Sequence, residues 1–534
     1  MPETSLTVGE YIAETLALNG IDTVFGIPGV HTLELYRGLA RSSLRHVLVR
    51  HEQGAGFEAD GYARLTGRPA AAMVISGPGL TNILTALGQA YTDSVPMLVV
   101  ASTAARHSLG KQWGALHELR GQRDIAATVT GHAGHAERAE DVREHLKLAF
   151  AAMRGARPRP AYLEVPLDVL GERTTLVPER FAEAAARPVA PPEAIARAAA
   201  VINAARAPLV IAGGGTQSAA ADLRAFVERL GAPCVLTTAG KGLLPEAHPQ
   251  NAGASLPYAA TQALVAAADV VVAVGTELAE TDHYVTRLTI AGTLVRIDVD
   301  PVKLADQYAA AVPVLGDAGP ALRALTASID VSGTRASADA SAARVRDVRE
   351  RIDASLNAPT LHLHALLAAM RRALPANAAL CTDMTQIAYA GNYAFATDLP
   401  GCWLHPSGYG TLGYALPAAV GAKFADPGRA VVALAGDFGL QFTLHELMTA
   451  VEHGLRLPIV VWNNEALGQI RDDMIGASIP PIGVVGRNPD FVALAQACGA
   501  LTERVDSADG LTAALTRALT ADGPTLIEVR PPSA

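Results

Sequence analysis

The sequence has few cysteines and no long uninterrupted apolar run. Its four cysteines form neither CxxC pairs nor clusters with histidine at metal-ligand spacing, which excludes a disulfide framework and a cysteine-based zinc site. The longer apolar stretches, such as residues 259–274, are interrupted by a charge (here Asp269) and are shorter than the ~20 residues that a membrane-spanning helix needs. We therefore expect reduced, buried cysteines and no membrane partner.

Blocks of positive charge are also missing. The 43 lysines and arginines are outnumbered by 52 aspartates and glutamates, and the formal net charge is -9. This balance gives no electrostatic reason to bind nucleic acid, so a small-molecule substrate is the better expectation. No basic stretch leads into an apolar run at the start of the chain, which is not typical of a signal peptide and predicts a cytoplasmic protein.

Half of the 534 residues are apolar, and the chain is too long for a single hydrophobic core. Strand-like apolar runs alternate with helical stretches rich in alanine and leucine, which is the pattern of parallel sheets covered by helices. Residues 171–192 and 331–354 have the composition of linkers. We predict an α/β protein with three doubly wound parallel-sheet domains, at residues 1–170, 190–330 and 358–534. The first and last domains are candidates for distant copies of one fold.

A glycine-aspartate turn follows an apolar strand in the last domain. It reads GDFG at residues 436–439, and the next strand ends in NN at residues 463–464. Asp437 and Asn464 are 27 residues apart, about one strand-helix-strand unit, so we expect them at the carboxyl ends of neighbouring parallel strands, where such sheets bind ligands. Oxygen ligands of this kind suit Mg²⁺ shared with phosphates. The alternative is a turn without a ligand.

Three further segments stand out: RHEQGAG at residues 50–56, SGPGLTN at residues 76–82 and GYGTLG at residues 408–413. Together with the GDFG turn, here called the metal turn, they resemble the motifs of thiamine diphosphate (ThDP)-dependent enzymes, in the same order and over nearly the whole chain. The region around the metal turn is similar to the acetolactate synthase branch. The resemblance implies a pyrimidine-binding first domain, a central domain and a diphosphate-binding last domain. One departure is Phe438, which stands where the family has a small residue.

The resemblance implies a role for each motif. Glu52 becomes the carboxyl group that bonds to the pyrimidine N1′ and promotes removal of the C2 proton, whereas a solvated glutamate at a helix start is the alternative. Mg²⁺ is bound by Asp437, Asn464 and the carbonyl of Ala466. Leu412 keeps the cofactor bent. The full set of expected cofactor-binding residues is Pro28, Glu52, Pro78, Asn82, Gln386, Gly410, Leu412, Gly436, Asp437, Phe438, Gly439 and Asn464.

In this family the cofactor lies between the first domain of one subunit and the last domain of another. The resemblance therefore implies at least a homodimer, and usually a homotetramer. Some relatives hold FAD in the central domain, and this chain has three glycines after a strand at residues 213–215. Ordinary turn chemistry explains them equally well, so FAD stays unassigned. A nicotinamide-dependent oxidoreductase is disfavoured because no GxGxxG turn occurs in the required context.

The implied reaction is decarboxylation of a 2-oxo acid to an aldehyde and CO₂, with carboligation of the acetolactate synthase type as the alternative. Residues 26–36, 116–123 and 468–474 resemble a branch that includes 5-guanidino-2-oxopentanoate (2-ketoarginine) decarboxylases. Beside Glu52, the resemblance and the residue types suggest His31 and Gln122 as catalytic residues.

A cationic substrate side chain is expected to be matched by carboxylates near the metal motif. The candidate substrate residues are His31, Gln122, Glu465, Arg471 and Asp472. The alternatives are a packed loop histidine at position 31 and solvated surface acids after the metal motif. A relative that has lost catalysis is disfavoured, because Glu52 and Asp437 are both present.

Overall fold

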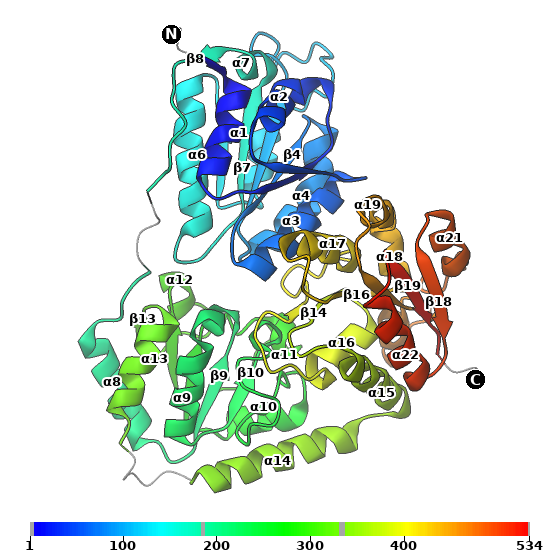
Figure 1. The fold of residues 1–534 in the computed structure, drawn as a ribbon. Helices are drawn as coiled ribbons and strands as arrows, with labels where there is room; N and C mark the ends of the chain where they lie inside the picture. Colours follow the sequence, from blue (N-terminus) through cyan, green and yellow to red (C-terminus); the bar gives the residue numbers. More distant parts are fainter. Residues whose placement is uncertain (1–4, 183–186, 331–336, 532–534) are drawn as a thin grey trace.

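The computed structural model describes residues 5–182, 187–330 and 337–531 and contains three α/β domains, each built on its own parallel sheet (Figure 1). The predicted fold class is confirmed. None of the helices in these ranges is long and apolar enough to cross a membrane. Three of the four cysteines are buried as expected, and Cys498 is only partly buried.

The first domain has a six-stranded sheet whose strands are all parallel. In spatial order they are β3 (Arg45–Leu48), β2 (Thr23–Gly26), β4 (Ala70–Val74), β5 (Met97–Thr103), β7 (Ala161–Pro166) and β6 (His132–His135). Its helices are α1 (Val8–Leu18), α2 (Leu33–Arg41), α3 (Glu52–Thr66), α4 (Pro78–Thr92), α5 (Gln122–Ala127), α6 (Ala139–Arg154) and α7 (Leu167–Leu170), with a 3-10 turn η1 (Val30–Thr32). The short strands β1 (Leu6–Thr7) and β8 (Arg173–Thr174) pair antiparallel beside it. Alternate residues of β5 face two cores, because both faces of the sheet are covered by helices.

The last domain has a second six-stranded parallel sheet. Its strands are β15 (Trp403–Leu404), β14 (Ala379–Thr382), β16 (Val431–Gly436), β17 (Pro458–Trp462), β19 (Thr525–Val529) and β18 (Leu501–Val505). Its helices are α15 (Ala358–Ala373), α16 (Gln386–Ala394), α17 (Ala415–Ala425), α18 (Asp437–Thr443), α19 (Glu446–Glu452), α20 (Gly468–Gly476), α21 (Phe491–Ala497) and α22 (Ala508–Ala518). When the strands are numbered along their own domain, both sheets have the order 2-1-3-4-6-5, so the first and last domains share one topology.

The central domain has a five-stranded parallel sheet of order 2-1-3-4-5. Its strands are β10 (Cys234–Leu236), β9 (Pro208–Ala212), β11 (Val270–Val274), β12 (Thr293–Asp298) and β13 (Val312–Leu315). Its helices are α8 (Pro192–Ala204), α9 (Ala220–Leu230), α10 (Ala259–Ala266), α11 (Glu280–His283), α12 (Pro301–Leu304), α13 (Ala318–Ser328) and α14 (Ala338–Ser355), with 3-10 turns η2 (Gly214–Ala219) and η3 (Thr238–Gly240).

The prediction of a linker at residues 331–354 is wrong for most of its length. Residues 338–355 form α14, which runs along the base of the molecule in Figure 1. Val345, Val348 and Ile352 lie on one face of this helix and pack into the central core, and Arg349 pairs with Glu246 of the same domain at 2.8 Å. Residues 331–336 of that stretch, and residues 183–186 of the other predicted linker, lie outside the described residues.

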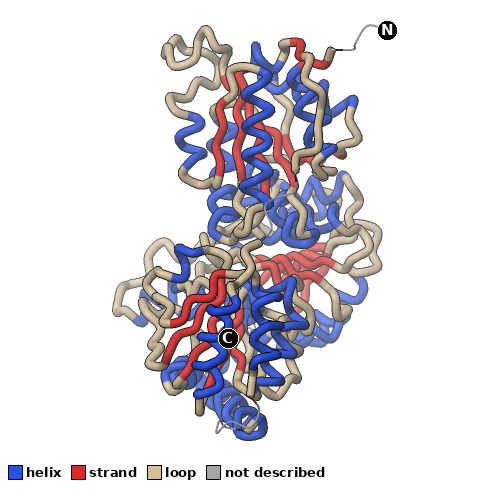
Figure 2. The backbone as a smooth tube through the Cα atoms, turned by 90° about the vertical axis from the view of Figure 1, so that its left-hand side faces the viewer, coloured by secondary structure: helices blue, strands red, loops and turns tan. Residues whose placement is uncertain are grey.

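The first and last domains meet inside one chain through two helices. Figure 2 shows the first sheet standing above the other two, with helices filling the junction. At this junction α3 crosses α17 so closely that a Cβ on Gly61 would lie 2.0 Å from the carbonyl oxygen of Ala418. A Cβ on Gly421 would likewise lie 1.8 Å from the carbonyl oxygen of Glu58. Glycine is required at both positions because the two backbones touch.

Candidate active site

A first group of predicted residues lies at the starts of α3 and α4. Glu52 is the first residue of α3, and its side chain is buried. Its Oε2 accepts a hydrogen bond of 2.9 Å from Nδ2 of Asn82, which lies one turn into α4. Pro78 begins α4, where a proline is tolerated because the first amide of a helix has no partner within the helix. The structure therefore brings Glu52 and Asn82 together, with Pro78 on the same helix as Asn82.

His31 lies in η1, just beyond β2 and the turn that contains Pro28. Its Nδ1 is 2.6 Å from Oγ of Ser76, and its ring centroid is 5.2 Å from that of His117. Burial, and then the nearby His117, lower the pKa of His31 below its ordinary value. The ring is therefore mostly neutral at neutral pH and offers an imidazole rather than an imidazolium to the site.

Gln122 begins α5 and is buried beside the turn that follows β4. Its Oε1 accepts a hydrogen bond of 2.8 Å from the amide of Gly77. Its Nε2 donates to the carbonyl of Ser102 at 2.9 Å and to the hydroxyl of Tyr162 at 2.8 Å. The structure thus joins Gln122 to the Gly77 turn, but no hydrogen bond joins it to Glu52.

A second group lies in the last domain, at the ends of β16 and β17. Asp437 follows β16 as the first residue of α18 and is almost fully buried. Its Oδ1 accepts from the amide of Phe438 at 2.9 Å, and its Oδ2 accepts from Nδ2 of Asn488 at 2.7 Å. Burial raises the pKa of Asp437, and within the described ranges no arginine, lysine or histidine forms an ion pair with it. A carboxylate buried without a cation is a group that a metal ion stabilises.

Asn464 lies just beyond β17, the strand next to β16. Its Nδ2 donates to Oε1 of Gln386 at 3.1 Å, and its Oδ1 accepts from the amide of Ala466 at 3.2 Å. A Cβ on Gly468 would lie 2.5 Å from both Nδ2 of Asn464 and Oε1 of Gln386, so this close arrangement requires glycine. Asp437, Asn464 and Ala466 together offer a carboxylate, an amide oxygen and a backbone carbonyl. This all-oxygen donor set fits Mg²⁺.

The glycines of the GDFG turn let α18 start close to the residues that follow β14. A Cβ on Gly439 would lie 2.6 Å from Oδ2 of Asp383, and a Cβ on Gly436 would lie 2.8 Å from Oγ1 of Thr385. The ring of Phe438 points elsewhere, toward the backbone of residue 486. The side chain of Phe438 is therefore accommodated beside residue 486, away from Asp383 and Thr385.

The GYGTLG loop, residues 408–413, is anchored to the first domain of its own chain. The amide of Gly408 donates to Oδ1 of Asp93 at 2.8 Å, and the hydroxyl of Thr411 donates to Oε1 of Gln89 at 3.2 Å. Gln89 lies in the last turn of α4, and Asp93 caps that helix. Contacts between two domains thus set the position of this loop.

Gly410 and Leu412 lie within the same loop. Gly410 is exposed and has a φ of 68°, which glycine adopts without strain. Leu412 is half-buried, and the next amide, that of Gly413, donates to Oδ2 of Asp383 at 2.9 Å. Burial raises the pKa of Asp383 to about 6, while the amides around it oppose that shift.

The predicted substrate residues of the last domain are more exposed. Asp472 lies in α20, where its Oδ2 accepts from Nε2 of Gln386 at 2.9 Å and its Oδ1 pairs with Arg471 at 2.9 Å. Glu465 is exposed and adopts the left-handed region with a φ of 55°. Asp472 therefore belongs to the Asn464 group through Gln386, and its charge is already partly balanced by Arg471.

The two groups form separate half-sites within one chain. His31, Glu52, Asn82 and Gln122 belong to the first domain, and the metal-turn group belongs to the last. Among the residues that the structure describes, no hydrogen bond or ion pair joins any of these four side chains to Asp437 or its bonded neighbours. The two groups therefore belong to different domains of one chain, although the amides of Arg50 and His51, next to Glu52, donate to Oε1 of Glu446 in α19 at 3.1 and 3.0 Å.

The three glycines of the central domain are used for chain packing. A Cβ on Gly213 would lie 2.5 Å from the carbonyl oxygen of Gly275, and a Cβ on Gly215 would lie 2.9 Å from Cα of Gly275. These contacts hold the loops after β9 and β11 against each other. The glycines therefore have a structural explanation that needs no nucleotide.

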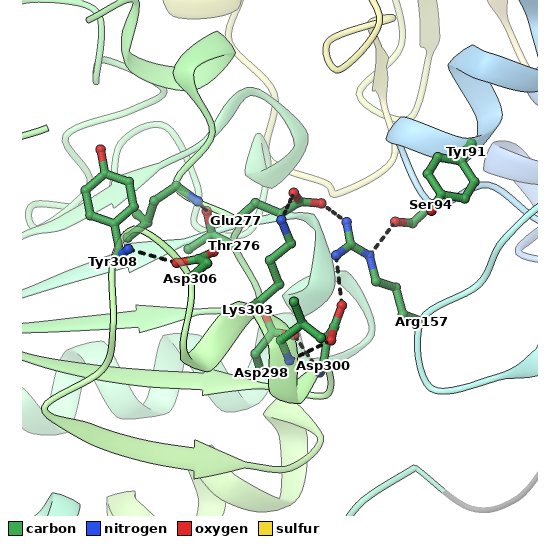
Figure 3. A network of polar contacts seen from close by, with 12 residues as sticks. Tyr91, Ser94, Arg157, Thr276, Glu277, Asp298, Asp300, Lys303, Asp306 and Tyr308 are labelled. Atoms are coloured by element: carbon green, nitrogen blue, oxygen red, sulfur yellow. Dashed lines mark hydrogen bonds and ion pairs between the residues drawn. The ribbon is translucent and has the colours of Figure 1, made fainter. Parts of the chain in front are cut away.

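Acidic residues at the carboxyl ends of β11 and β12 in the central sheet pair with an arginine of the first domain (Figure 3). Arg157 of the first domain pairs with Asp300 at 3.1 Å and with Glu277, and its Nε donates to Ser94 at 3.1 Å. Lys303 also pairs with Glu277, at 2.7 Å. Arg157 and Lys303 are thus paired with Asp300 and Glu277 within the protein. This arrangement gives no support to FAD.

Three polar residues of the two half-sites were missed as separate candidates by sequence reasoning. Ser76 was seen only as part of its motif, although its hydroxyl lies against His31. Asn488 bridges Oδ2 of Asp437 and Oδ1 of Asn463, and it lies in an irregular loop before α21 that carries no strand-end signal. His117 lies in a long loop after β5, and no sequence signal placed it beside His31.

Comparison with known proteins gives matches along the whole chain. Three family profiles for the thiamine pyrophosphate enzyme match: the N-terminal TPP binding domain at residues 6–127, the central domain at residues 195–325 and the C-terminal TPP binding domain at residues 383–529. A probable 2-ketoarginine decarboxylase of Pseudomonas aeruginosa is 50% identical over 535 residues, which covers 99% of this chain and 95% of that protein.

A more distant relative and a solved structure also match nearly the whole chain. The large subunit of acetolactate synthase isozyme 1 from Escherichia coli is 30% identical over 541 residues, covering 98% of this chain and 94% of that protein. The crystal structure of a putative thiamin diphosphate-dependent enzyme from Mycobacterium smegmatis superposes with a TM-score of 0.85 at 27% identity, covering 99% of both chains. The chain therefore belongs to the thiamine pyrophosphate enzyme family.

Proposed function

We propose that this enzyme decarboxylates 5-guanidino-2-oxopentanoate in a reaction that depends on ThDP and Mg²⁺. The products are CO₂ and the aldehyde that is one carbon shorter. The observation that carries the proposal is the 50% identity, over almost the full length of both chains, to a probable 2-ketoarginine decarboxylase. The polar groups of both half-sites support the same chemistry.

The cofactor, when bound, supplies the carbon that attacks the 2-oxo carbonyl and accepts the electrons released with CO₂. The protein's contribution begins with Glu52, whose buried carboxyl group exchanges a proton with the ring nitrogen N1′ of the cofactor. Asn82 donates to Oε2 of Glu52, which leaves Oε1 for the cofactor. This partly buried bond fixes the direction in which the side chain of Glu52 points.

In the last domain we assign Mg²⁺ to Asp437, Asn464 and the carbonyl of Ala466. Asn488 orients Asp437 by donating to its Oδ2. Gln386 does the same for Asn464 by accepting from its Nδ2, which leaves the amide oxygen of Asn464 as a ligand. Mg²⁺ held by these residues would supply the positive charge that binds the diphosphate of the cofactor beside the Asp437 carboxylate.

His31 is the group we assign to the proton transfer that completes aldehyde release. Its lowered pKa makes it a neutral imidazole, which passes a proton without carrying a permanent charge. Ser76 bonds to Nδ1 of the ring, so we assign the proton transfer to Nε2.

The guanidinium group of the substrate is assigned to the acidic residues beyond the metal motif. Asp472 is the stronger candidate, since Gln386 bonds to both Asp472 and Asn464, whereas no hydrogen bond among the described residues joins the side chain of Glu465 to Gln386. Arg471 balances part of the charge of Asp472, so this contact contributes to selectivity between substrates more than to affinity.

The enzyme is further proposed to act as a homodimer or a higher oligomer. Each chain presents one half-site with Glu52 and another with Asp437, and no polar contact among the described residues joins them. Two chains that place the first domain of one against the last domain of the other would complete two sites. What supports this pairing is that the two groups belong to different domains of the chain.

The test is CO₂ release by the purified protein with Mg²⁺ and ThDP, on 5-guanidino-2-oxopentanoate, pyruvate, 2-oxobutanoate and benzoylformate. Mass spectrometry identifies the products. We expect the guanidino acid to be preferred and to give one aldehyde per CO₂. Acetolactate as the main product from pyruvate would instead favour carboligation, which the 30% identity to an acetolactate synthase makes the second candidate. No release from any of the four acids would refute both.

A further inference from the structure

A continuous chain of hydrogen bonds leads from the active-site turn to the far edge of the first sheet. It starts at the amide of Gly77 and passes through the side chain of Gln122 to the hydroxyl of Tyr162, over bonds of 2.8 Å each. The hydroxyl of Tyr162 donates to Oε2 of Glu164 at 2.9 Å. Oε1 of Glu164 is bonded at 2.7 Å to Nδ1 of His135 on the edge strand β6. None of the residues beyond Gln122 belongs to a recognised motif.

Tyr162 and Glu164 meet because both lie on β7, two residues apart, and so point to the same face of the sheet. Tyr162 is fully buried and Glu164 almost so. Burial, followed by the charge of Glu164, raises the pKa of Tyr162 well above its ordinary value, so the hydroxyl keeps its proton and donates. The bond to Glu164 raises the pKa of His135, which favours the ring as the donor at the other end.

The donors and acceptors of this chain allow one arrangement only. The amide of Gly77 can only donate and the carbonyl of Ser102 can only accept, so the side-chain amide of Gln122 cannot be turned over. Tyr162 accepts from Gln122 and must therefore give its own proton to Glu164. The three bonds from Gly77 to Glu164 point the same way, so each one polarises the next and strengthens it, and the His135 ring donates to Glu164 from the other side.

The active-site end of the chain leaves little room for movement. Gly77 has a φ of 61°, and a Cβ there would lie 2.6 Å from the carbonyl oxygen of His117. The preceding residue, Ser76, holds Nδ1 of His31 at 2.6 Å. A shift of the Gly77 amide therefore displaces Ser76 and with it the ring of His31.

We infer that Tyr162 and Glu164 are positioning residues of the active site, which act by holding Gln122 against the Ser76–Gly77 turn. Gln122 is then a support for this turn and not a ligand of the substrate, since both hydrogens of its amide group are bonded within the protein. The catalytic consequence rests on the proposed function. The hydrogen-bond chain itself does not.

The first test compares Tyr162→Phe with Tyr11→Phe. Tyr11 is also fully buried, but it lies in α1, in the core on the opposite face of the same sheet. We expect kcat of Tyr162→Phe to fall about tenfold, because His31 is displaced, while KM and the ThDP dissociation constant stay within about twofold. Tyr11→Phe is expected to keep wild-type kcat. An equal fall of kcat in the two variants would mean that Tyr162 has only a structural role.

The second test asks for rescue by a conservative change. Glu164→Gln keeps an oxygen that accepts from Tyr162, and we expect it to retain at least about half of the wild-type kcat. Glu164→Leu removes the acceptor and should behave like Tyr162→Phe. A Glu164→Leu variant as active as Glu164→Gln would overturn the inference.

The third test needs neither cofactor nor turnover. Amide hydrogen exchange at Gly77 is measured in the cofactor-free protein, and it should be at least about tenfold faster in Tyr162→Phe than in Tyr11→Phe. Unchanged exchange overturns the inference even if the enzyme decarboxylates as proposed. Faster exchange with unchanged kcat overturns the positioning role. If the wild type releases no CO₂, the proposed function fails while the exchange experiment still decides whether the chain holds Gly77.

Discussion

The two half-sites of the chain solve different electrostatic problems. In the first domain the acidic group, Glu52, is bonded to a neutral amide, while Gln122 is bonded to Gly77 and His31 to Ser76. In the last domain the acidic group, Asp437, is buried among amides and has no cation beside it within the described residues. The first arrangement fixes the direction of a carboxyl group. The second is suited to receiving a cation.

This difference teaches what each half-site contributes. A paired carboxyl group keeps its direction without a ligand, so the first half is organised before the cofactor arrives. A buried carboxylate that lacks a cation gains stability when the ion binds, so the last half is completed by it. The four changes that follow test this contrast, from the largest expected effect to the smallest.

Glu52→Gln tests the proton role of the first half. Glutamine keeps an oxygen that accepts from Asn82 but cannot exchange a proton with the cofactor, so we expect turnover to fall by about 10²- to 10⁴-fold. The Mg²⁺-ThDP dissociation constant, measured by calorimetry, should change only a few-fold. Glu34→Gln, which alters an exposed ion pair of α2, is the control and should keep wild-type turnover.

Asp437→Asn tests the cation role of the last half. Loss of the carboxylate should weaken Mg²⁺-dependent ThDP binding on the order of 100-fold, because the ion loses its charged ligand. Asp509→Asn, at an exposed site on α22, should have no effect. Removal of Mg²⁺ from the wild type with a chelator should reproduce the loss. Tight, metal-independent ThDP binding by Asp437→Asn would contradict the assignment.

Asn488→Ala tests whether the orientation of Asp437 matters separately from its charge. Without the bond to Oδ2 the carboxylate turns more freely, and we expect Mg²⁺ affinity to fall about tenfold. The measurement is the Mg²⁺ concentration that restores half-maximal activity. An unchanged value would mean that Phe438 and the helix start are sufficient to hold Asp437.

Asp472→Asn tests the proposed substrate contact and should have the smallest effect. We expect kcat/KM for the guanidino acid to fall several-fold relative to pyruvate, because an exposed pair contributes about 1 kcal/mol or less. Asp473→Asn is the matched control, since its side chain bonds to Gln469 instead of Gln386. An equal change in kcat/KM for both substrates would contradict the assignment of the guanidinium group to Asp472.

The architecture was largely predictable from local patterns. The alternation of buried strands and helices predicts parallel sheets, because strands covered on both faces must be apolar along their whole length. The spacing of Asp437 and Asn464 correctly predicted that they follow neighbouring strands. The helix at residues 338–355 was missed because its apolar face is narrow and its many charged residues resemble those of a linker.

The roles within the site were less predictable. Gln122 stands at a position similar to a substrate-binding glutamine, yet the structure surrounds its amide with Gly77, Ser102 and Tyr162. Those partners come from three other segments of the chain. Their proximity is a property of the folded sheet that no local pattern encodes.

By itself, the sequence determined the α/β class, the order of the cofactor motifs and the donor types of the metal turn, because these depend on short-range periodicity and on residue chemistry. Only the tertiary structure decided which groups are bonded to which. It showed that Asn488 bonds to Asp437 and that Tyr162 bonds to both Gln122 and Glu164. The physical reason is that a hydrogen bond depends on distances of a few ångströms, and residues far apart in the chain reach those distances only when the sheets are packed.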